Sequence, residues 1–159
     1  PRVDVEELLQ LLPKITAECQ SILSFNLKEA WQMADFFDAA FSGKKDPESV
    51  AGLAGFLKEK IDVDRIIIHP NDGAACASSQ GTFYLPGPVC QKPLISTGAG
   101  DAFGAGCLSG ALLGLDDLGL LLMGVCTSGH FVRTGESPSF QQIAALIEQW
   151  QKGPLPERL

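Results

Sequence analysis

The residues best suited to chemistry form the run Ser-Thr-Gly-Ala-Gly-Asp-Ala-Phe at positions 96–103. Glycines that follow an extended segment and open a helix expose several backbone N–H groups in one direction. The helix dipole adds roughly half a positive charge at the same end. This pattern predicts an anion hole suited to a phosphoryl group in transfer, with Asp101 in the first helical turn.

Asp101 has the properties of an orienting base. A carboxylate at a helix N-terminus is stabilised as an anion and is therefore a weak base. In a loose phosphoryl-transfer transition state the acceptor hydroxyl loses its proton late, so it needs orientation more than strong deprotonation. The same spacing equally allows a structural glycine turn in which Asp101 only starts the helix.

A second candidate site begins at Asn26, directly after the apolar segment Ser21–Phe25, which predicts a short buried strand. The sequence Asn-Leu-Lys-Glu places Asn26 and Glu29 at the entrance of one helix. Taken alone, this spacing favours a capping arrangement, with Asn26 at the N-cap and Glu29 at the third helical position.

The composition excludes several classes of protein. A formal net charge of −7 argues against nucleic acid or an anionic membrane as the main partner. The five cysteines are widely spaced without a C-x-x-C pair, so we expect free thiols in a reducing cytoplasm rather than a zinc site or disulfides. The uncharged runs 102–115 and 118–129 fall short of the roughly 20 residues that a membrane span needs. We therefore expect a cytoplasmic protein.

Hydrophobic periodicity over the 159 residues predicts one α/β domain with a mostly parallel sheet flanked by helices. A β-hairpin is expected around Gln80-Gly81. Pro13 should kink or split the first helix. The expected elements are a helix at 4–20, a strand at 21–25, helices at 26–37 and 48–60, a strand at 63–69, hairpin strands at 74–79 and 82–85, and helices at 102–115, 116–132 and 139–150.

The run Gly98-Ala99-Gly100-Asp101, followed by Ala102-Phe103 and a small-residue helix, resembles the second signature of the ribokinase-like (PfkB) carbohydrate kinases. The resemblance implies a ribokinase-like fold that uses ATP and Mg²⁺. It also implies that Asp101 is the catalytic base and that the amides of Gly98, Ala99 and Gly100 form the anion hole.

The segment Arg133–Ser139 resembles the final glycine-containing loop of the same family, which borders the nucleotide. That loop often borders a monovalent-cation site, so the resemblance implies K⁺ or a similar ion near Ile95, Thr97, Gly135 and Ser139. Ile95 stands where the family usually has an acidic residue, so only its backbone carbonyl could face a cation.

The Asn26-x-x-Glu29 pair resembles the family's motif that helps to place magnesium and phosphates. With a buried strand before it and Gly98–Asp101 downstream, this functional interpretation is favoured over a helix cap alone. Glu29 is then expected to hold Mg²⁺ through water. The residues implied in nucleotide binding are Asn26, His69, Gly73, Thr97 and Gly135.

The remaining chemically capable side chains are interpreted more simply. His69 and His130 lack the spacing of metal ligands. His130 lies in an apolar segment, which favours a hydrogen-bonded packing role, whereas His69 ends a strand and is a candidate for nucleotide contact. Cys107 and Cys126 lie in small-residue helices and are expected in the core.

The resemblance covers essentially all of residues 1–159 but only the C-terminal part of the family's fold. The chain begins with Pro in mid-pattern, so we expect a processed product or a fragment that lacks the N-terminal sugar-binding half and lid. The implied partners are a sugar-like small molecule and ATP, and a homodimer of the full-length protein stays open.

Three functions compete at this point. The first is ATP-dependent phosphorylation of a hydroxyl on a sugar or sugar-like substrate, with the fragment alone inactive. The second is a non-catalytic protein, derived from this kinase fold, that binds a nucleotide or metabolite. The third is a truncated structural piece that exposes the surface where missing strands should pair.

Overall fold

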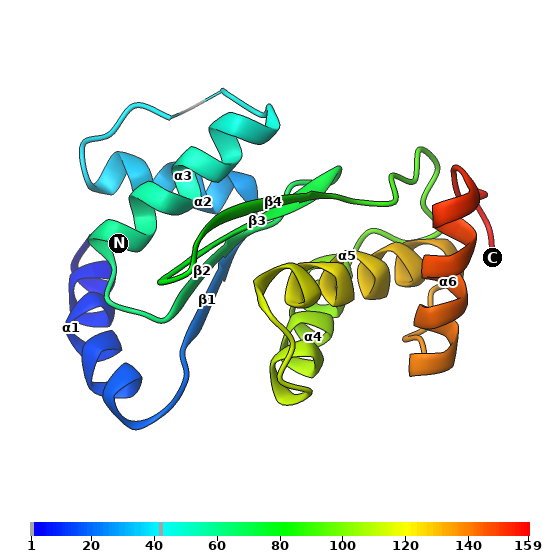
Figure 1. Ribbon diagram of the computed structural model, residues 1–159. Coiled ribbons are helices and arrows are strands. Elements are labelled where there is room, and N and C mark those ends of the chain that lie inside the picture. The colour runs from blue at the N-terminus through cyan, green and yellow to red at the C-terminus, as the bar shows by residue number, and fades with distance from the viewer. Residues whose placement is uncertain (1, 42) are drawn as a thin grey trace. The chain divides into compact units, whose positions relative to one another are not determined.

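The computed structural model describes residues 2–41 and 43–159, apart from the side chains of Arg2 and Val3. Its elements follow the order that the sequence predicts, and the α/β class is confirmed (Figure 1). The elements are α1 (Arg2–Glu18), β1 (Ile22–Phe25), α2 (Leu27–Phe36), α3 (Pro47–Lys60), β2 (Arg65–Ile68), β3 (Gly73–Ser78), β4 (Gly81–Pro86), α4 (Ala99–Leu112), α5 (Asp117–Thr134) and α6 (Phe140–Lys152).

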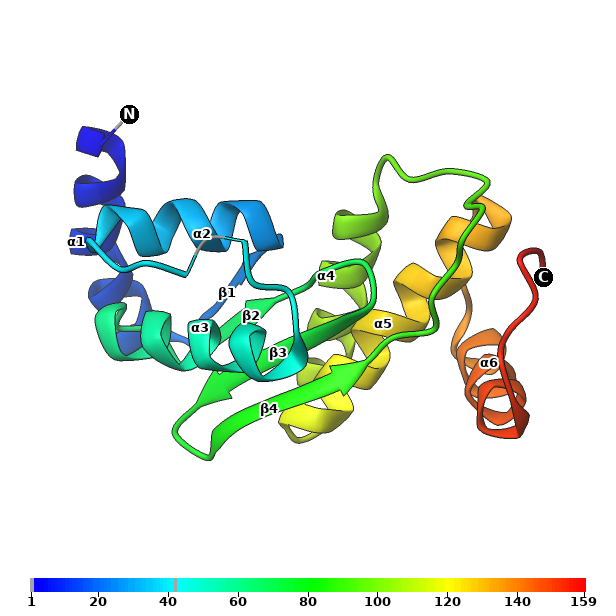
Figure 2. The same ribbon diagram turned by 90° about the horizontal axis from the view of Figure 1, so that it is seen from above.

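The four strands form one sheet in the order β1-β2-β3-β4 (Figure 2). Strand β1 pairs with β2 in parallel, with Phe25 opposite Ile68. Strand β2 pairs with β3 antiparallel, with Ile67 opposite Cys76. The sheet is therefore mixed rather than mostly parallel. Only a short turn separates Ile68 from Gly73, whereas a parallel crossover needs about a dozen residues or more.

The chain divides into two compact units. The first comprises the chain up to Pro70 together with Ala75–Tyr84, and the second comprises Asn71–Ala74 together with Leu85–Leu159. Asn26, Glu29 and His69 thus belong to the first unit. All other predicted site residues belong to the second.

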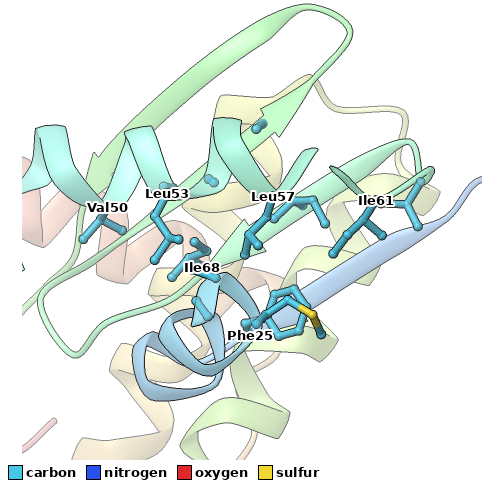
Figure 3. Packing of buried hydrophobic residues seen from close by; sticks show 14 of the residues in the cluster. Phe25, Val50, Leu53, Leu57, Ile61 and Ile68 are labelled. Carbon is cyan, nitrogen blue, oxygen red and sulfur yellow. The ribbon is translucent and has the colours of Figure 1, made fainter. Parts of the chain in front are cut away.

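Helix α3 supplies much of the first unit's core. Its buried face carries Val50, Leu53 and Leu57, which pack against Ile68 of β2 and Phe25 of β1 (Figure 3). Burial of each such aliphatic side chain stabilises the fold by about 1.5–3 kcal/mol. This packing fixes β1 and β2, whose carboxyl ends lead into Asn26 and His69.

Of the expected kink or split at Pro13, the split is wrong, because helix α1 runs unbroken from Arg2 to Glu18. Pro13 has no backbone N–H to donate within the helix, but the part of the helix after it makes other hydrogen bonds. The Thr16 hydroxyl donates to the carbonyl of Asp62 at 3.1 Å and lies 2.8 Å from the Ser21 hydroxyl. These contacts attach the end of α1 to the segments that flank the sheet.

The second unit is built around a close pair of helices, α4 and α5. The buried face of α4 consists of Phe103, Gly106, Cys107 and Gly110. A Cβ atom added at Gly106 would lie 2.5 Å from the Met123 carbonyl oxygen, so the two backbones approach closely only because the residue is glycine.

The two helical cysteines are buried, as the sequence predicts. A Cβ atom added at Gly124 would lie 2.6 Å from the Cys107 sulfur. Burial raises the pKa of the Cys126 thiol to about 12, which makes this thiol unreactive at neutral pH. Across residues 2–41 and 43–159, no helix is both long and apolar enough to cross a membrane.

Candidate active site

The glycine-rich turn opens α4, as the sequence predicts, with Gly98 at the N-cap. Gly98 has a φ of +86°, a left-handed conformation that side chains disfavour. The ring of Phe131 on α5 lies 3.4 Å from the place that a Cβ atom would occupy. The backbone angle therefore favours glycine here, whereas the distance to Phe131 is an ordinary van der Waals contact.

The first turn of α4 presents backbone donors and one carboxylate. The first N–H groups of a helix have no acceptor within it, and the Ala102 N–H is the first to reach one, the Gly98 carbonyl at 2.9 Å. The Ala99 N–H donates to the Ser96 carbonyl at 3.2 Å. Asp101 lies in this turn and its side chain is exposed. An incoming anion therefore meets the positive end of the helix beside a solvent-facing carboxylate.

The end of α5 brings the glycine-rich turn and the Gly135 loop together. The Leu94 N–H donates to the Val132 carbonyl at 2.7 Å. Gly135 ends α5 with a φ of +78°, and its N–H donates to the Phe131 carbonyl at 2.8 Å. Because Phe131 also contacts Gly98, one turn of α5 supports both segments. The glycine-rich turn and the Gly135 loop therefore lie next to the same turn of α5.

A cavity of about 590 Å³ lies beside the Gly135 loop. Its walls include Leu94, His130, Thr134 and Glu136, together with side chains of α6. The volume falls within the roughly 300–1,000 Å³ of small-molecule sites. His130 itself is buried, with Nδ1 3.2 Å from both the Glu136 carbonyl and the Thr134 hydroxyl, so its predicted packing role is confirmed.

Four further predicted residues also belong to the second unit. Ile95 and Thr97 are exposed on the segment that leads into the turn. The hydroxyl of Ser139 caps α6 by accepting the Gln142 N–H at 3.3 Å. Gly73 starts β3 and lies against Gly87, where an added Cβ atom would be 3.4 Å from the Gly73 Cα.

In the first unit, Asn26 and Glu29 form the capping box that their spacing predicts. The Glu29 N–H donates to the Asn26 side-chain oxygen at 2.9 Å, and the Asn26 N–H donates to Glu29 Oε2 at 2.9 Å. Both side chains are exposed at the start of α2. The capping bond engages one of the two carboxylate oxygens of Glu29.

His69 lies beside this capping box. Strands β1 and β2 are parallel and in register, so Asn26 and His69 follow the ends of neighbouring strands. The His69 N–H donates to the Phe25 carbonyl at 3.0 Å. Burial lowers the pKa of the His69 imidazole, and the negative charge of Glu29 opposes part of that change. His69 is therefore neutral at pH 7.

The comparisons with known proteins agree with this architecture. A family model described as prokaryotic ketohexokinase matches residues 4–150. The chain belongs to the prokaryotic ketohexokinase family. The expected resemblance to ribokinase-like sugar kinases is thereby confirmed at the level of the family.

Among the relatives of this ketohexokinase-family chain is a ketohexokinase of Haloferax volcanii. It is 31% identical over 87 residues, which cover 55% of this chain and 23% of that protein. The Escherichia coli ribokinase II solved with ATP and Mg²⁺ shares the fold with a TM-score of 0.63 at 21% identity, over 93% of this chain and 45% of that one. A Methanocaldococcus jannaschii nucleoside kinase has a TM-score of 0.64 at 20% identity, over 89% and 44%. This chain therefore spans less than half the length of these relatives.

Glu29 is the predicted site residue whose carboxylate could hold a divalent metal ion. No group of three or more His, Cys, Asp or Glu side chains could hold a metal ion within the part of the chain that the structure describes. Mg²⁺ usually keeps several waters and binds one or two carboxylates plus substrate phosphates. The exposed carboxylate of Glu29 could supply one such ligand.

Two charged residues of the second unit make buried or long-range hydrogen bonds that the sequence motifs did not predict. Arg133 is almost fully buried, and Glu157 binds backbone N–H groups of a distant segment. Arg133 stands at the start of the recognised loop segment, but nothing in its spacing distinguishes it from a solvated helix end. Glu157 lies outside every motif.

Proposed function

We propose that the protein containing this chain transfers a phosphoryl group from ATP to a hydroxyl of a sugar or sugar-like substrate. The carrying observation is the exposed carboxylate of Asp101 in the first turn of α4, directly after the left-handed Gly98. Membership of the prokaryotic ketohexokinase family supports the same chemistry.

In this proposal, Asp101 orients the acceptor hydroxyl and receives its proton late in the transfer. The amides of Gly98, Ala99 and Gly100 donate to the oxygens of the phosphoryl group. The Ala99 N–H must then exchange its 3.2 Å bond to the Ser96 carbonyl for the stronger acceptor. The dipole of α4 adds to the same attraction.

The residues proposed to contact the nucleotide are Asn26, His69, Gly73, Thr97 and Gly135. Glu29 orients waters around Mg²⁺, which, when bound with ATP, neutralises charge on the phosphates. We also propose that a monovalent cation such as K⁺ binds near Thr97, Gly135, Ser139 and the carbonyl of Ile95.

The test is Asp101→Asn in the complete protein. We expect the phosphorylation rate to fall by about 10²–10⁴-fold with little change in nucleotide affinity, because the carboxylate acts mainly in the transition state. Rate and affinity are measured separately, by a coupled assay and by calorimetry.

Asp116→Asn is the matched control, since Asp116 caps α5 by accepting the Gly119 N–H and Asn caps equally well. An Asp101→Asn protein that keeps more than about a tenth of the rate is incompatible with Asp101 as the base. Nucleotide binding without turnover in the wild type would instead favour the non-catalytic binding protein.

A further inference from the structure

Arg133 is a buried cation that is held by backbone carbonyls. Only 1% of the residue is exposed. Its Nε donates to the Pro156 carbonyl at 2.8 Å, Nη1 to Pro88 at 3.0 Å and Gly129 at 2.8 Å, and Nη2 to Val89 at 2.7 Å. A buried charge is costly unless such bonds satisfy it, so this geometry is specific to the planar guanidinium fork.

These four carbonyls belong to three separate segments. Gly129 lies on α5 itself, Pro88 and Val89 lie on the connector between β4 and α4, and Pro156 lies on the tail after α6. The fork of Arg133 therefore ties the connector and the tail to the last turns of α5. Pro88 also packs so closely on Gly129 that an added Cβ atom there would be 2.6 Å from the proline ring.

Glu157 on the tail binds the same connector by accepting hydrogen bonds from the connector's N–H groups. Its carboxylate accepts from the Lys92 N–H at 2.6 Å, the Gln91 N–H at 3.2 Å and the Cys90 S–H at 3.2 Å. These bonds, that of Lys92 first, hold the pKa of Glu157 below its ordinary value. The connector is thus held at its carbonyls by a cation and at its N–H groups by an anion.

The connector leads directly into the catalytic turn of the proposed function. After Lys92 it meets α5 again at Val132, through the Leu94 N–H, and then at Phe131, which contacts Gly98. The last turns of α5 therefore guide the chain from Pro88 to Gly98. We therefore expect a displacement of residues 88–92 to shift Gly98 and Asp101 as well.

We propose that Arg133 and Glu157 are positioning residues, which fix the connector on α5 and thereby set the placement of Asp101 relative to the Gly135 loop. This inference rests on the proposed function. It assigns no contact with substrate to either side chain. A displacement of about 1 Å at a reacting group can cost about 100-fold in rate, so a role at this distance is energetically sufficient.

The test compares Arg133→Lys and Glu157→Gln in the complete protein. Lys keeps the charge of Arg133 but loses the fork, and Gln keeps one acceptor of Glu157 but loses the charge. We expect kcat to fall about 10- to 100-fold in each, with KM for ATP nearly unchanged, because misplacement of Asp101 affects the transition state more than nucleotide binding.

Glu148→Gln on α6 makes the same chemical change at an exposed carboxylate and should leave kcat unchanged. All assays are run well below the measured Tm and are normalised to folded protein. If Arg133→Lys does not fold, Glu157→Gln alone decides, because its side chain is only partly buried.

A folded Glu157→Gln protein with wild-type kcat would overturn the inference, as would a loss of kcat that only follows the loss of folded protein. The two proposals fail in different ways. If Asp101→Asn keeps its turnover, the proposed function has failed. If Asp101→Asn abolishes turnover while Glu157→Gln is silent, only the positioning role has failed.

Discussion

The carboxylate of Glu29 interacts with two groups in different ways, by a hydrogen bond with one and by its charge with the other. One is the Asn26 N–H, which needs only an acceptor at 2.9 Å. The other is His69, whose pKa depends on the negative charge. A substitution that keeps the acceptor and removes the charge therefore separates the two.

We expect Glu29→Gln to lower the pKa of His69 further, because burial already lowers it and the opposing charge is then lost. Thermal stability at neutral pH should hardly change, since Gln also completes a capping box. Titration of the His69 ring by NMR in both proteins measures the effect. An unchanged or raised His69 pKa would show that the two side chains do not interact.

The same shift has a consequence for stability against pH. An imidazole with a lowered pKa in the folded state contributes stability that is complete above its unfolded value, about 6.5. That contribution is lost as the pH falls through the folded pKa. Because Glu29→Gln lowers the folded pKa, the loss extends to lower pH, and the variant should be the less stable protein in acid.

In the complete protein, Glu29→Gln also tests the proposed metal role. Loss of the charge that would orient the magnesium waters should raise the Mg²⁺ requirement and lower kcat. Titration of Mg²⁺ against both proteins measures this. Coincident curves would mean that Asn26 and Glu29 serve only as a helix cap.

The sequence predicts one of these two contacts and misses the other. The cap follows from a spacing of three residues on one helix, which local geometry determines. The approach of His69 to Glu29 depends on the register that places Phe25 opposite Ile68, and these residues lie far apart along the chain. Register between distant strands is set by packing of the whole core, so no local pattern reveals it.

At the scale of elements, the contact between α4 and α5 depends on glycine at one face. Gly106 faces backbone, with the Met123 carbonyl 2.5 Å from an added Cβ atom, whereas an added Cβ at Gly104 meets nothing within 4 Å. The two glycines lie in the same helix and differ in what they contact. They therefore form a matched pair for substitution.

We expect Gly106→Ala to destabilise the protein by about 1–3 kcal/mol, the usual cost of overpacking. Gly104→Ala should instead be neutral or stabilising by up to about 1 kcal/mol, because Ala is the better helix former. Urea unfolding of both variants measures the difference. Equal effects of the two substitutions would show that α4 and α5 do not pack as closely as described.

The same scale shows where element prediction fails. The order of helices and strands follows from periodicity, but the orientation of β3 does not, and the mostly parallel sheet is wrong. The short link from Ile68 to Gly73 already favours an antiparallel return. The burial of Arg133 is harder to predict, because its carbonyl acceptors come from segments that only the folded chain assembles.

At the scale of the molecule, the chain spans 45% of the E. coli ribokinase II length and leaves large apolar side chains exposed. Leu112 on α4 is 81% exposed, and Leu108 and Leu113 are 57% and 59% exposed. Strand β1 stands at the end of the sheet that the described residues form. That this chain is part of a larger kinase fold stays a prediction.

We therefore expect residues 1–159 alone to bind ATP or ADP weakly at best and to phosphorylate no sugar. The physical reason is that the resemblance places the sugar-binding half outside residues 1–159. Without that half, the acceptor hydroxyl would not be oriented toward the proposed base, Asp101. Calorimetry with each nucleotide and a coupled assay across several sugars measure both properties. The Asp101→Asn chain is the control for contaminating host kinase, because a contaminant's rate does not respond to that substitution. Robust turnover by the wild-type chain, abolished by Asp101→Asn, would mean that these residues already form a complete kinase.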